Sequence, residues 1–393
     1  MSTPPSSNPV LDRLLKYLEL DERNRPLRQD ALQEACRAGA WLIARKLVED
    51  GLLLHPDEAG LLELCGVSCL RARRYDDAEH MIALIFERGA GDSNLRYSLA
   101  LAMSMQGRHG DALEQLSGDA VIHDVEIAPL LKARCLHHLD RLDDAIVECS
   151  TYLSRVPRDA NGHGVMALLL YDKGGQPAAS RHCRTALELD PSQCEGLLVQ
   201  ALIQQDAREM DGALATFDRL VSAHPTCGRG WLGKALINMG QQRMAAANED
   251  IELAIHYMPM HIGSWHVLAW ILILQGDAEG AERAFRSALE LDRTFAETHG
   301  GLAAVAALQG REDEARAGIR RARGLSPDVM SAVYAEFVLF QRDGRDGEAR
   351  RLVEAFVNRA PKGREIPFRE SLILQMLGTP GSDESDPPHR TLH

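Results

Sequence analysis

The hydrophobic pattern of this chain recurs with a period of 34 residues. A small residue marks the period most clearly, because alanine recurs every 34 residues with a single step of 33. Four residues after each alanine, one helical turn further on, there is usually a larger apolar residue such as Phe217 or Ile251. Such a pattern predicts repeated helical units. The ten alanines are Ala44, Ala78, Ala112, Ala145, Ala179, Ala213, Ala247, Ala281, Ala315 and Ala349.

A second column of mostly small residues lies twelve positions before these alanines. Two antiparallel helices approach closely only where side chains are small, so the two columns predict the point at which a pair of helices crosses. Larger residues, Leu32 and Phe337, occupy the column in the outer copies. Its other members are Gly66, Ala100, Ala133, Ala167, Ala201, Ala235, Ala269 and Ala303.

Glycine and proline divide the pattern into pairs of helices. Glycine precedes the alanine column by five residues in six copies, where the chain turns between the two helices. Proline follows it by twelve residues in seven copies and ends the second helix, because proline lacks the N–H that a helix needs. The glycines are Gly39, Gly107, Gly174, Gly276, Gly310 and Gly344, and the prolines are Pro56, Pro157, Pro191, Pro225, Pro259, Pro327 and Pro361.

The pattern covers residues 25–363 as ten units. The third unit is one residue short and its second helix weakens after Leu116, so we expect repeats 1–3 in 25–118, an irregular joint in 119–125 and repeats 4–10 in 126–363. A stack of repeats needs capping elements at its ends. Residues 10–24 and 364–377 contain apolar patterns suited to capping helices. The polar, proline-containing segments 1–9 and 378–393 are expected to be disordered tails.

The pattern resembles the tetratricopeptide repeat (TPR), with Trp231, Ala235, Ala247 and Pro259 in one copy. The resemblance implies an all-α fold, a right-handed α-solenoid of antiparallel helix pairs. In that family the first helices line a concave surface, and positions 2, 5, 9, 12 and 13 of each repeat face the ligand. Applied to repeats three to eight, this predicts a partner-binding groove that includes Tyr97, Leu101, Leu130, Arg134, Leu168, Tyr171, Leu198, Leu202, Leu232, Leu236, His266 and Trp270.

This groove would be largely apolar, and an apolar surface of that size usually marks an interaction site. We therefore expect a non-catalytic scaffold or adaptor that binds a protein helix or an extended peptide segment, with a chaperone-like role as one variant. Three alternatives remain open: these leucines belong to ordinary packing between repeats, the chain's own terminal helix fills the groove, or a second copy fills it through self-association. A regulatory subunit of a secretion, polysaccharide or transferase complex is the alternative function.

Charge and hydropathy indicate whether nucleic acids or membranes are expected partners. The net charge is −13 and arginines alternate with acidic residues, as in Arg345-Asp346-Gly347-Glu348, so we expect no nucleic-acid partner. No apolar stretch is long enough for a membrane span, and the polar N-terminus has no signal-peptide pattern. We expect a cytoplasmic protein without membrane insertion. Its composition, rich in alanine, arginine and leucine, is typical of bacterial proteins.

The sequence lacks the common motifs of catalytic, phosphate-binding and metal-binding sites. It contains no glycine-rich phosphate loop, no G-x-S-x-G and no H-E-x-x-H, so we expect neither an enzyme nor a cofactor. The eight cysteines include no C-x-x-C pair, and we expect Cys65, Cys69 and Cys135 to pack as small apolar residues rather than bind a metal. The Lys/Asn/Arg clamp of repeats that bind acidic chaperone tails is also absent: Gln29, Gln33, Glu63 and Val67 occupy positions that we compared with it.

Overall fold

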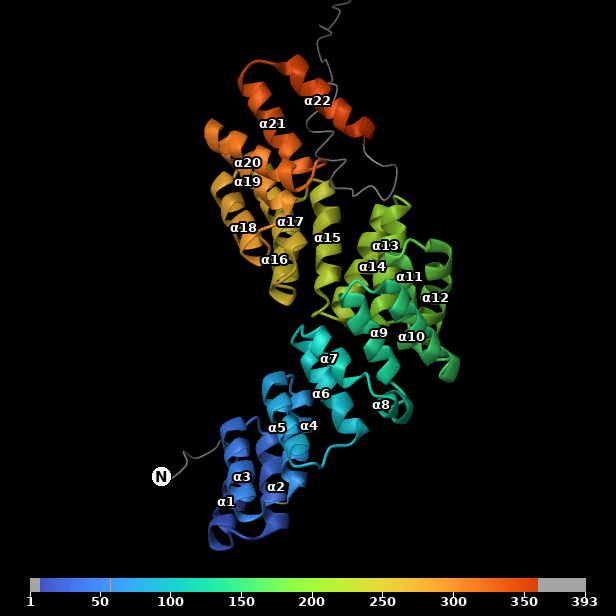
Figure 1. Cartoon of the computed structure of the whole chain (residues 1–393), viewed down its shortest axis with the longest axis vertical. Coiled ribbons are helices and arrows are strands. Elements are labelled where there is room, and N and C mark those ends of the chain that lie inside the picture. The colour runs from blue at the N-terminus through green and yellow to red at the C-terminus, as the bar shows by residue number, and fades with distance from the viewer. Residues whose placement is uncertain (1–7, 57, 360–393) are drawn as a thin grey trace, which may run out of the picture. The chain divides into compact units, whose positions relative to one another are not determined.

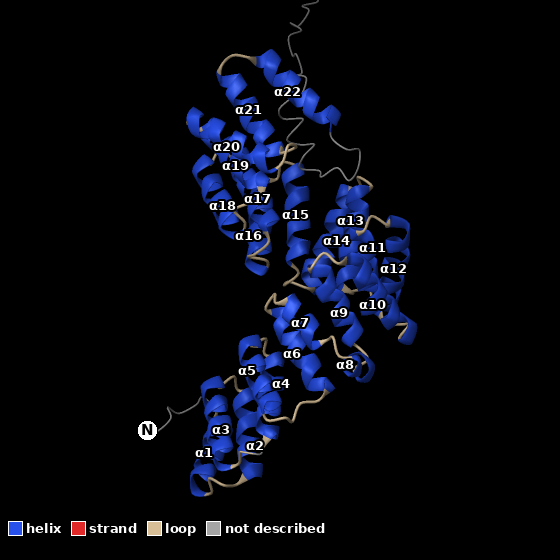
Figure 2. Ribbon diagram, in the orientation of Figure 1, coloured by secondary structure: helices blue, strands red, loops and turns tan. Residues whose placement is uncertain are grey.

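The computed structural model describes residues 8–56 and 58–359. Across these ranges the chain forms 22 helices joined by short turns and contains no strand (Figures 1 and 2). The fold is an all-α solenoid of helix pairs. The predicted capping helix 364–377, the predicted tail 378–393 and residues 1–7 of the other tail lie outside the described residues.

Two compact units make up the chain, with the boundary between Leu189 and Asp190. The helices of the first unit are α1 (Pro9–Leu20), α2 (Arg25–Arg37), α3 (Trp41–Leu54), α4 (Ala59–Arg71), α5 (Tyr75–Glu87), α6 (Ser93–Met105), α7 (His109–Gln115), α8 (Asp119–Asp124), α9 (Ala128–His138), α10 (Leu142–Arg155), α11 (Ala160–Asp172) and α12 (Gln176–Leu189). Those of the second are α13 (Cys194–Asp206), α14 (Met210–Ala223), α15 (Gly228–Gly240), α16 (Met244–Tyr257), α17 (Ile262–Leu274), α18 (Ala278–Leu291), α19 (Ala296–Leu308), α20 (Glu312–Leu325), α21 (Met330–Arg342) and α22 (Asp346–Arg359).

Within each unit, every repeat is a pair of helices that pack against each other and against the next repeat of that unit. In the second unit α15 packs on α16, α16 on the following α17, and first helices such as α17 and α19 also touch. The alanine column lies at these crossings: Ala213, Ala247 and Ala281 are fully buried. Small side chains let the helix backbones approach, and larger residues such as Phe217 and Phe285 fill the space beside them.

All ten repeats turn between their two helices through one residue with positive φ. With the first residue of each repeat as position 1, this residue is position 15. Glycine occupies it in six repeats and accepts the left-handed conformation without steric cost. The other four repeats place Arg73, Asp140, Arg208 and Gln242 there, with φ between 57° and 65°. The next N–H then reaches the carbonyl five residues earlier, as from Gly175 to Leu170 at 2.8 Å, which is a Schellman cap.

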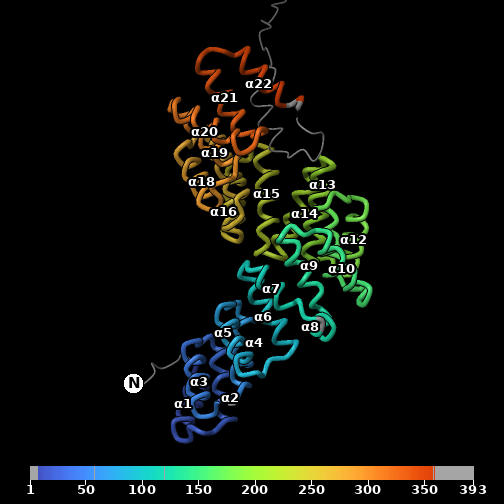
Figure 3. The backbone as a smooth tube through the Cα atoms, in the orientation of Figure 1, coloured from blue at the N-terminus to red at the C-terminus, as the bar shows by residue number. Residues whose placement is uncertain are grey.

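The region after the third repeat departs from the regular pattern. Helix α7 ends at Gln115, and the six-residue α8 follows before α9 begins at Ala128 (Figure 3). Leu116, Val121 and Val125 are buried here and form a small cluster with Ala112. A joint in 119–125 between two blocks of repeats stays a prediction, because the boundary of the compact units lies elsewhere.

The first helix covers the start of the stack and is shorter than the segment 10–24 expected from the sequence. Helix α1 ends at Leu20, and Asn24 then caps α2 by accepting the N–H of Leu27 at 3.0 Å. Leu11 and Leu18 of α1 are buried in the cluster that contains the first repeats. The chain therefore needs residues 21–24 as a connection between the capping helix and the first repeat.

Candidate functional site

The twelve predicted groove residues all lie on first helices, but they differ in exposure. Six lie on α6, α9 and α11 in the first unit, and six on α13, α15 and α17 in the second. Five side chains are buried and seven are partly exposed. The buried ones are Leu130, Leu168, Tyr171, Leu198 and Trp270, and the partly exposed ones are Tyr97, Leu101, Arg134, Leu202, Leu232, Leu236 and His266. Only the second group presents surface to a partner in this structure.

Trp270 is buried because an aromatic residue two repeats further along the chain reaches it. The rings of Trp270 and Tyr334 meet edge to face, with centroids 5.2 Å apart. Helix α19 lies between them in sequence and presents small residues, among them Gly300 and Ala304, which are both buried. A Cβ on Gly300 would lie 2.7 Å from the backbone nitrogen of Ala332, so α19 and α21 are in close contact. The small residues of α19 thus permit contacts that cover Trp270.

Glu297 also belongs to the packing of α19 on α21. It occupies position 2 of its repeat, a position expected to face a ligand. Its carboxylate instead accepts the N–H groups of Met330 and Ser331 at 2.9 and 3.0 Å. These N–H groups begin α21 and have no partner within that helix. Glu297 therefore caps the next repeat.

His266 lies in a largely apolar environment. Its ring meets Phe285 and Phe295 edge to face, each with centroids 5.3 Å apart, and its Nε2 is 2.8 Å from the hydroxyl of Thr298. Burial lowers the pKa of His266 to about 4. The ring is therefore neutral at neutral pH and interacts as a polar but uncharged group.

Three leucines are the partly exposed apolar members of the predicted groove in the second unit. Leu232 and Leu236 are four residues apart on α15 and therefore share one face of that helix. Leu202 on α13 occupies the repeat position that Leu236 occupies on α15, and α13 packs beside α15. Leu232 and Leu236 rest on the core of the unit without being fully covered by it. We call Leu202, Leu232 and Leu236 the leucine surface.

In the first unit, Tyr97, Leu101 and Arg134 are the partly exposed members of the predicted groove. Tyr97 and Leu101 share one face of α6 and pack on a small cluster that includes Ala100 and Leu131. Burial raises the pKa of Tyr97, and the positive charge of Arg134 on α9 opposes that shift. This trio is more polar than the leucine surface.

Helix α15 also carries polar side chains, Lys234 and Asn238, which form a network with the neighbouring helices α14 and α16. The ammonium group of Lys234 lies 3.0 Å from Asp218 and 3.3 Å from the buried Asp250, and it also lies over the ring of Trp231. The amide of Asn238 donates to Asp250 at 2.7 Å. Because each buried polar group has a partner, the network holds α14, α15 and α16 together.

A recurring contact that the sequence pattern did not reveal holds three first helices, α11, α15 and α17, to the preceding loop. Trp231 and Trp265 donate their indole N–H to the carbonyls of Pro225 and Pro259, at 2.7 and 2.9 Å. His163 makes the equivalent contact with the carbonyl of Pro157 at 3.1 Å. The donor is always at position 4, six residues after the acceptor, and this fixed spacing would have been the signal. These aromatic residues therefore stabilise the loop between repeats.

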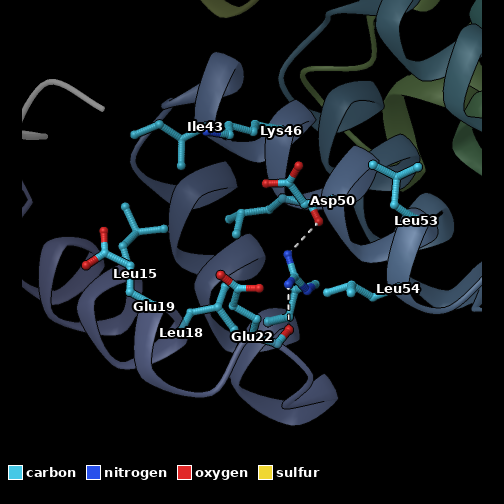
Figure 4. A pocket seen from close by; sticks show the side chains of 11 residues that line it. Leu15, Leu18, Glu19, Glu22, Ile43, Lys46, Asp50, Leu53 and Leu54 are labelled. Atoms are coloured by element: carbon cyan, nitrogen blue, oxygen red, sulfur yellow. Dashed lines mark hydrogen bonds between the residues drawn. The ribbon is translucent and has the colours of Figure 1, made fainter. Parts of the chain in front are cut away.

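A cavity of about 410 Å³ lies between α1, α2 and α3, away from the predicted groove. Its lining combines leucines such as Leu15 and Leu18 with the charged residues Glu19, Lys46 and Asp50 (Figure 4). The buried Arg28 forms part of its wall and donates to the carbonyl of Glu22 at 2.7 Å. The guanidinium thus ties the loop after the capping helix to the first repeat.

Neither a metal centre nor a membrane span is found in the described ranges. No group of three or more histidine, cysteine or acidic side chains there has a geometry that could hold a metal ion. None of the helices in those ranges is long and apolar enough to cross a membrane.

Comparison with known proteins places the repeats in a family. Two stretches, residues 198–255 and 272–336, match models of the tetratricopeptide repeat. A search of curated proteins finds no match.

Solved structures with a similar fold share little sequence with the chain. A monomeric mutant of IFIT1 with m7Gppp-AAAA is 13% identical and has a TM-score of 0.55, covering 89% of this chain and 94% of that one. PilF of Pseudomonas aeruginosa is 16% identical, with a TM-score of 0.46 and coverage of 55% and 97%. YrrB, described as a TPR protein with an unusual peptide-binding site, is 16% identical, with a TM-score of 0.36 and coverage of 49% and 99%.

At 13% identity the likeness to IFIT1 concerns the fold alone. The two family matches fall within the ten units that share one register of alanine, proline and turn positions. Residues 198–255 and 272–336 of this chain are therefore tetratricopeptide repeats.

Proposed function

We propose that this protein is a non-catalytic interaction scaffold that binds a helix or an extended segment of a partner protein across the leucine surface. The observation that carries the proposal is the partial exposure of Leu202, Leu232 and Leu236 on two adjacent first helices. Side chains that served only the core would be covered, as Leu198 is on the same α13. Apolar side chains left at the surface of neighbouring helices are suited to bind the apolar face of a partner.

The chemistry of the surroundings favours a partner with an apolar stripe. The neutral His266 continues the surface on α17 without adding a formal charge. An amphipathic helix would place side chains three or four residues apart on this surface, matching the spacing of Leu232 and Leu236 on α15. A chaperone-like role would use the same surface on an unfolded client. A regulatory subunit would use it on a neighbouring subunit.

The proposal is tested by placing charges in the leucine surface. The double variant Leu202→Glu with Leu236→Glu should weaken partner binding by at least about tenfold, because each carboxylate would lose water when the partner covers it. Partners are first identified by affinity purification of the tagged full chain from its native cells. The dissociation constant of the purified partner is then measured for both proteins.

The matched control is Leu253→Glu, a leucine on the second helix α16 that is already exposed. This variant should bind the partner as the unmodified protein does, and circular dichroism should show both variants folded. A double variant that unfolds would show that these leucines belong to the core. A folded double variant that binds every partner with unchanged affinity would place the site elsewhere, and the proposal would be wrong.

A further inference from the structure

Two cysteines, the first and the last residue of one repeat, meet at the starts of the first helices α13 and α15. Cys194 is the first residue of α13, and Cys227 is the residue that precedes α15 as its N-cap. The two helices pack side by side, and the thiols of Cys194 and Cys227 are in hydrogen-bonding contact. Both residues are partly exposed. A pair of nucleophilic groups is thus held together within reach of small molecules in solution.

The surroundings of Cys227 favour its thiolate form. The hydrogen bond with Cys194 lowers the pKa of Cys227 to about 7, with smaller contributions in the same direction from the backbone amide of Gly230 and the charge of Arg229. Burial and the carboxylate of Glu195 oppose this shift. The thiolate of Cys227 is therefore more populated at neutral pH than that of an ordinary cysteine, and the thiolate is the form that reacts with oxidants.

We propose that Cys194 and Cys227 form a redox-responsive dithiol site that peroxides oxidise to a disulfide joining the starts of the neighbouring helices α13 and α15. The Cys227 thiolate attacks one peroxide oxygen and breaks the O–O bond, giving a sulfenic acid and hydroxide, which becomes water by taking a proton. The sulfur of Cys194 then attacks the sulfenic sulfur. An S–S bond forms, and the hydroxyl leaves as water with the proton of the Cys194 thiol. Two thiols lose two electrons, and one peroxide becomes two waters.

The other cysteines are less suited to this chemistry. Cys36 is partly exposed, and the hydrogen bond with Cys65 also lowers its pKa to about 7. Its thiol partner Cys65 is buried, however, as is Cys69 beyond it, so Cys36 lacks an accessible second thiol. Cys149 is fully buried, with its thiol 3.4 Å from the carbonyl of Gly162. An oxidant reaches Cys194 and Cys227 without opening the core, so their disulfide should form before any other.

The decisive experiment maps disulfides in the full-length protein after brief treatment with hydrogen peroxide near one equivalent. Unreacted thiols are blocked with iodoacetamide, and trypsin is used without a reductant. The two cysteines fall in different tryptic peptides, residues 185–208 and 220–229. These peptides should appear as one linked species in mass spectra and separate again after dithiothreitol. If both remain alkylated while Cys36 is oxidised, or if Cys227 stops at sulfenic or sulfinic acid without linking, the proposal is wrong.

A second measurement tests the contact between the two thiols and needs no oxidation. In Cys194→Ala, Cys227 loses its hydrogen-bonding partner, so its alkylation by iodoacetamide at pH 7 should slow several-fold and its reactivity should rise only at higher pH. Cys183→Ala, which removes a buried thiol from the first unit, should leave the rate at Cys227 unchanged. Equal rates at Cys227 in the Cys194→Ala and unmodified proteins would show that Cys194 does not activate Cys227.

Discussion

His266 shows how the surroundings of a single residue determine its chemistry. The sequence places it at a ligand-facing position, where a histidine is expected to be solvated and able to gain a proton. The structure instead packs it between Phe285 and Phe295, and burial holds its pKa at about 4. Burial likewise lowers the pKa of His109, His182 and His261. At this scale the repeat pattern identifies a position but not the properties of the side chain there.

The low pKa of His266 predicts a loss of stability in mild acid. Its unfolded-state pKa is about 6.5, so between pH 6.5 and 4 the unfolded chain binds a proton that the folded protein does not. The contribution of His266 is complete above pH 6.5 and falls as the pH is lowered, by roughly 2 kcal/mol at pH 5. His266→Phe should therefore lose less stability than the unmodified protein between pH 7 and pH 5 in urea unfolding.

A control for this experiment is His256→Phe, which changes an exposed histidine on α16. This variant should follow the pH dependence of the unmodified protein. Identical pH dependence in all three proteins would show that His266 gains its proton equally well in the folded and unfolded states.

At the scale of the helix pair, the sequence pattern and the structure agree because both reflect one steric requirement. The alanine column is buried wherever the two helices cross, and the turn residue adopts positive φ in every repeat. The pattern identified only the six glycines at this turn. Arg73, Asp140, Arg208 and Gln242 adopt the same conformation at a cost of about 1 kcal/mol each, which tertiary packing of the pair outweighs.

The assigned crossing of α15 and α16 can be tested by making the same Ala→Leu substitution at two nearby positions of α16, one buried and one exposed. Ala247→Leu adds three carbons at a fully buried site and should cost about 1–3 kcal/mol in the free energy of unfolding. Ala245→Leu makes the same change on an exposed position of α16 and should stay within about 0.5 kcal/mol. Urea unfolding measures both. Similar losses in the two variants would contradict the assigned crossing.

At the scale of the whole molecule, the distribution of charge is the basis for the prediction that nucleic acids are not partners. The net charge is −13, and many arginines are paired with acidic residues within the same repeat or the next one. Arg311 contacts both Glu282 and Glu314, at 2.7 and 2.5 Å, and Arg286 contacts Glu282 at 2.6 Å. Arginines held in this way do not form the continuous basic stripe that phosphate backbones require.

This arrangement predicts weak binding to nucleic acids. Fluorescence anisotropy with a labelled single-stranded RNA at about 0.15 M salt should give a dissociation constant weaker than about 10 µM, because few phosphate contacts are available to release counterions. Lowering the salt concentration should strengthen binding only slightly. Submicromolar binding with a steep salt dependence would show that a basic surface forms after all.

The sequence by itself determined the features that repeat: the helix pairs, their crossing at small residues, the six turns with glycine at position 15 and the resemblance to the tetratricopeptide repeat. These features follow from contacts between residues close in sequence, so a periodic pattern records them. Only the tertiary structure decided which first-helix side chains stay exposed. Trp270 is covered by Tyr334 from two repeats away, whereas Leu232 and Leu236 are left partly open. Whether a first-helix side chain is covered depends on the size of the residues on the neighbouring helices. The period of the pattern does not record that size.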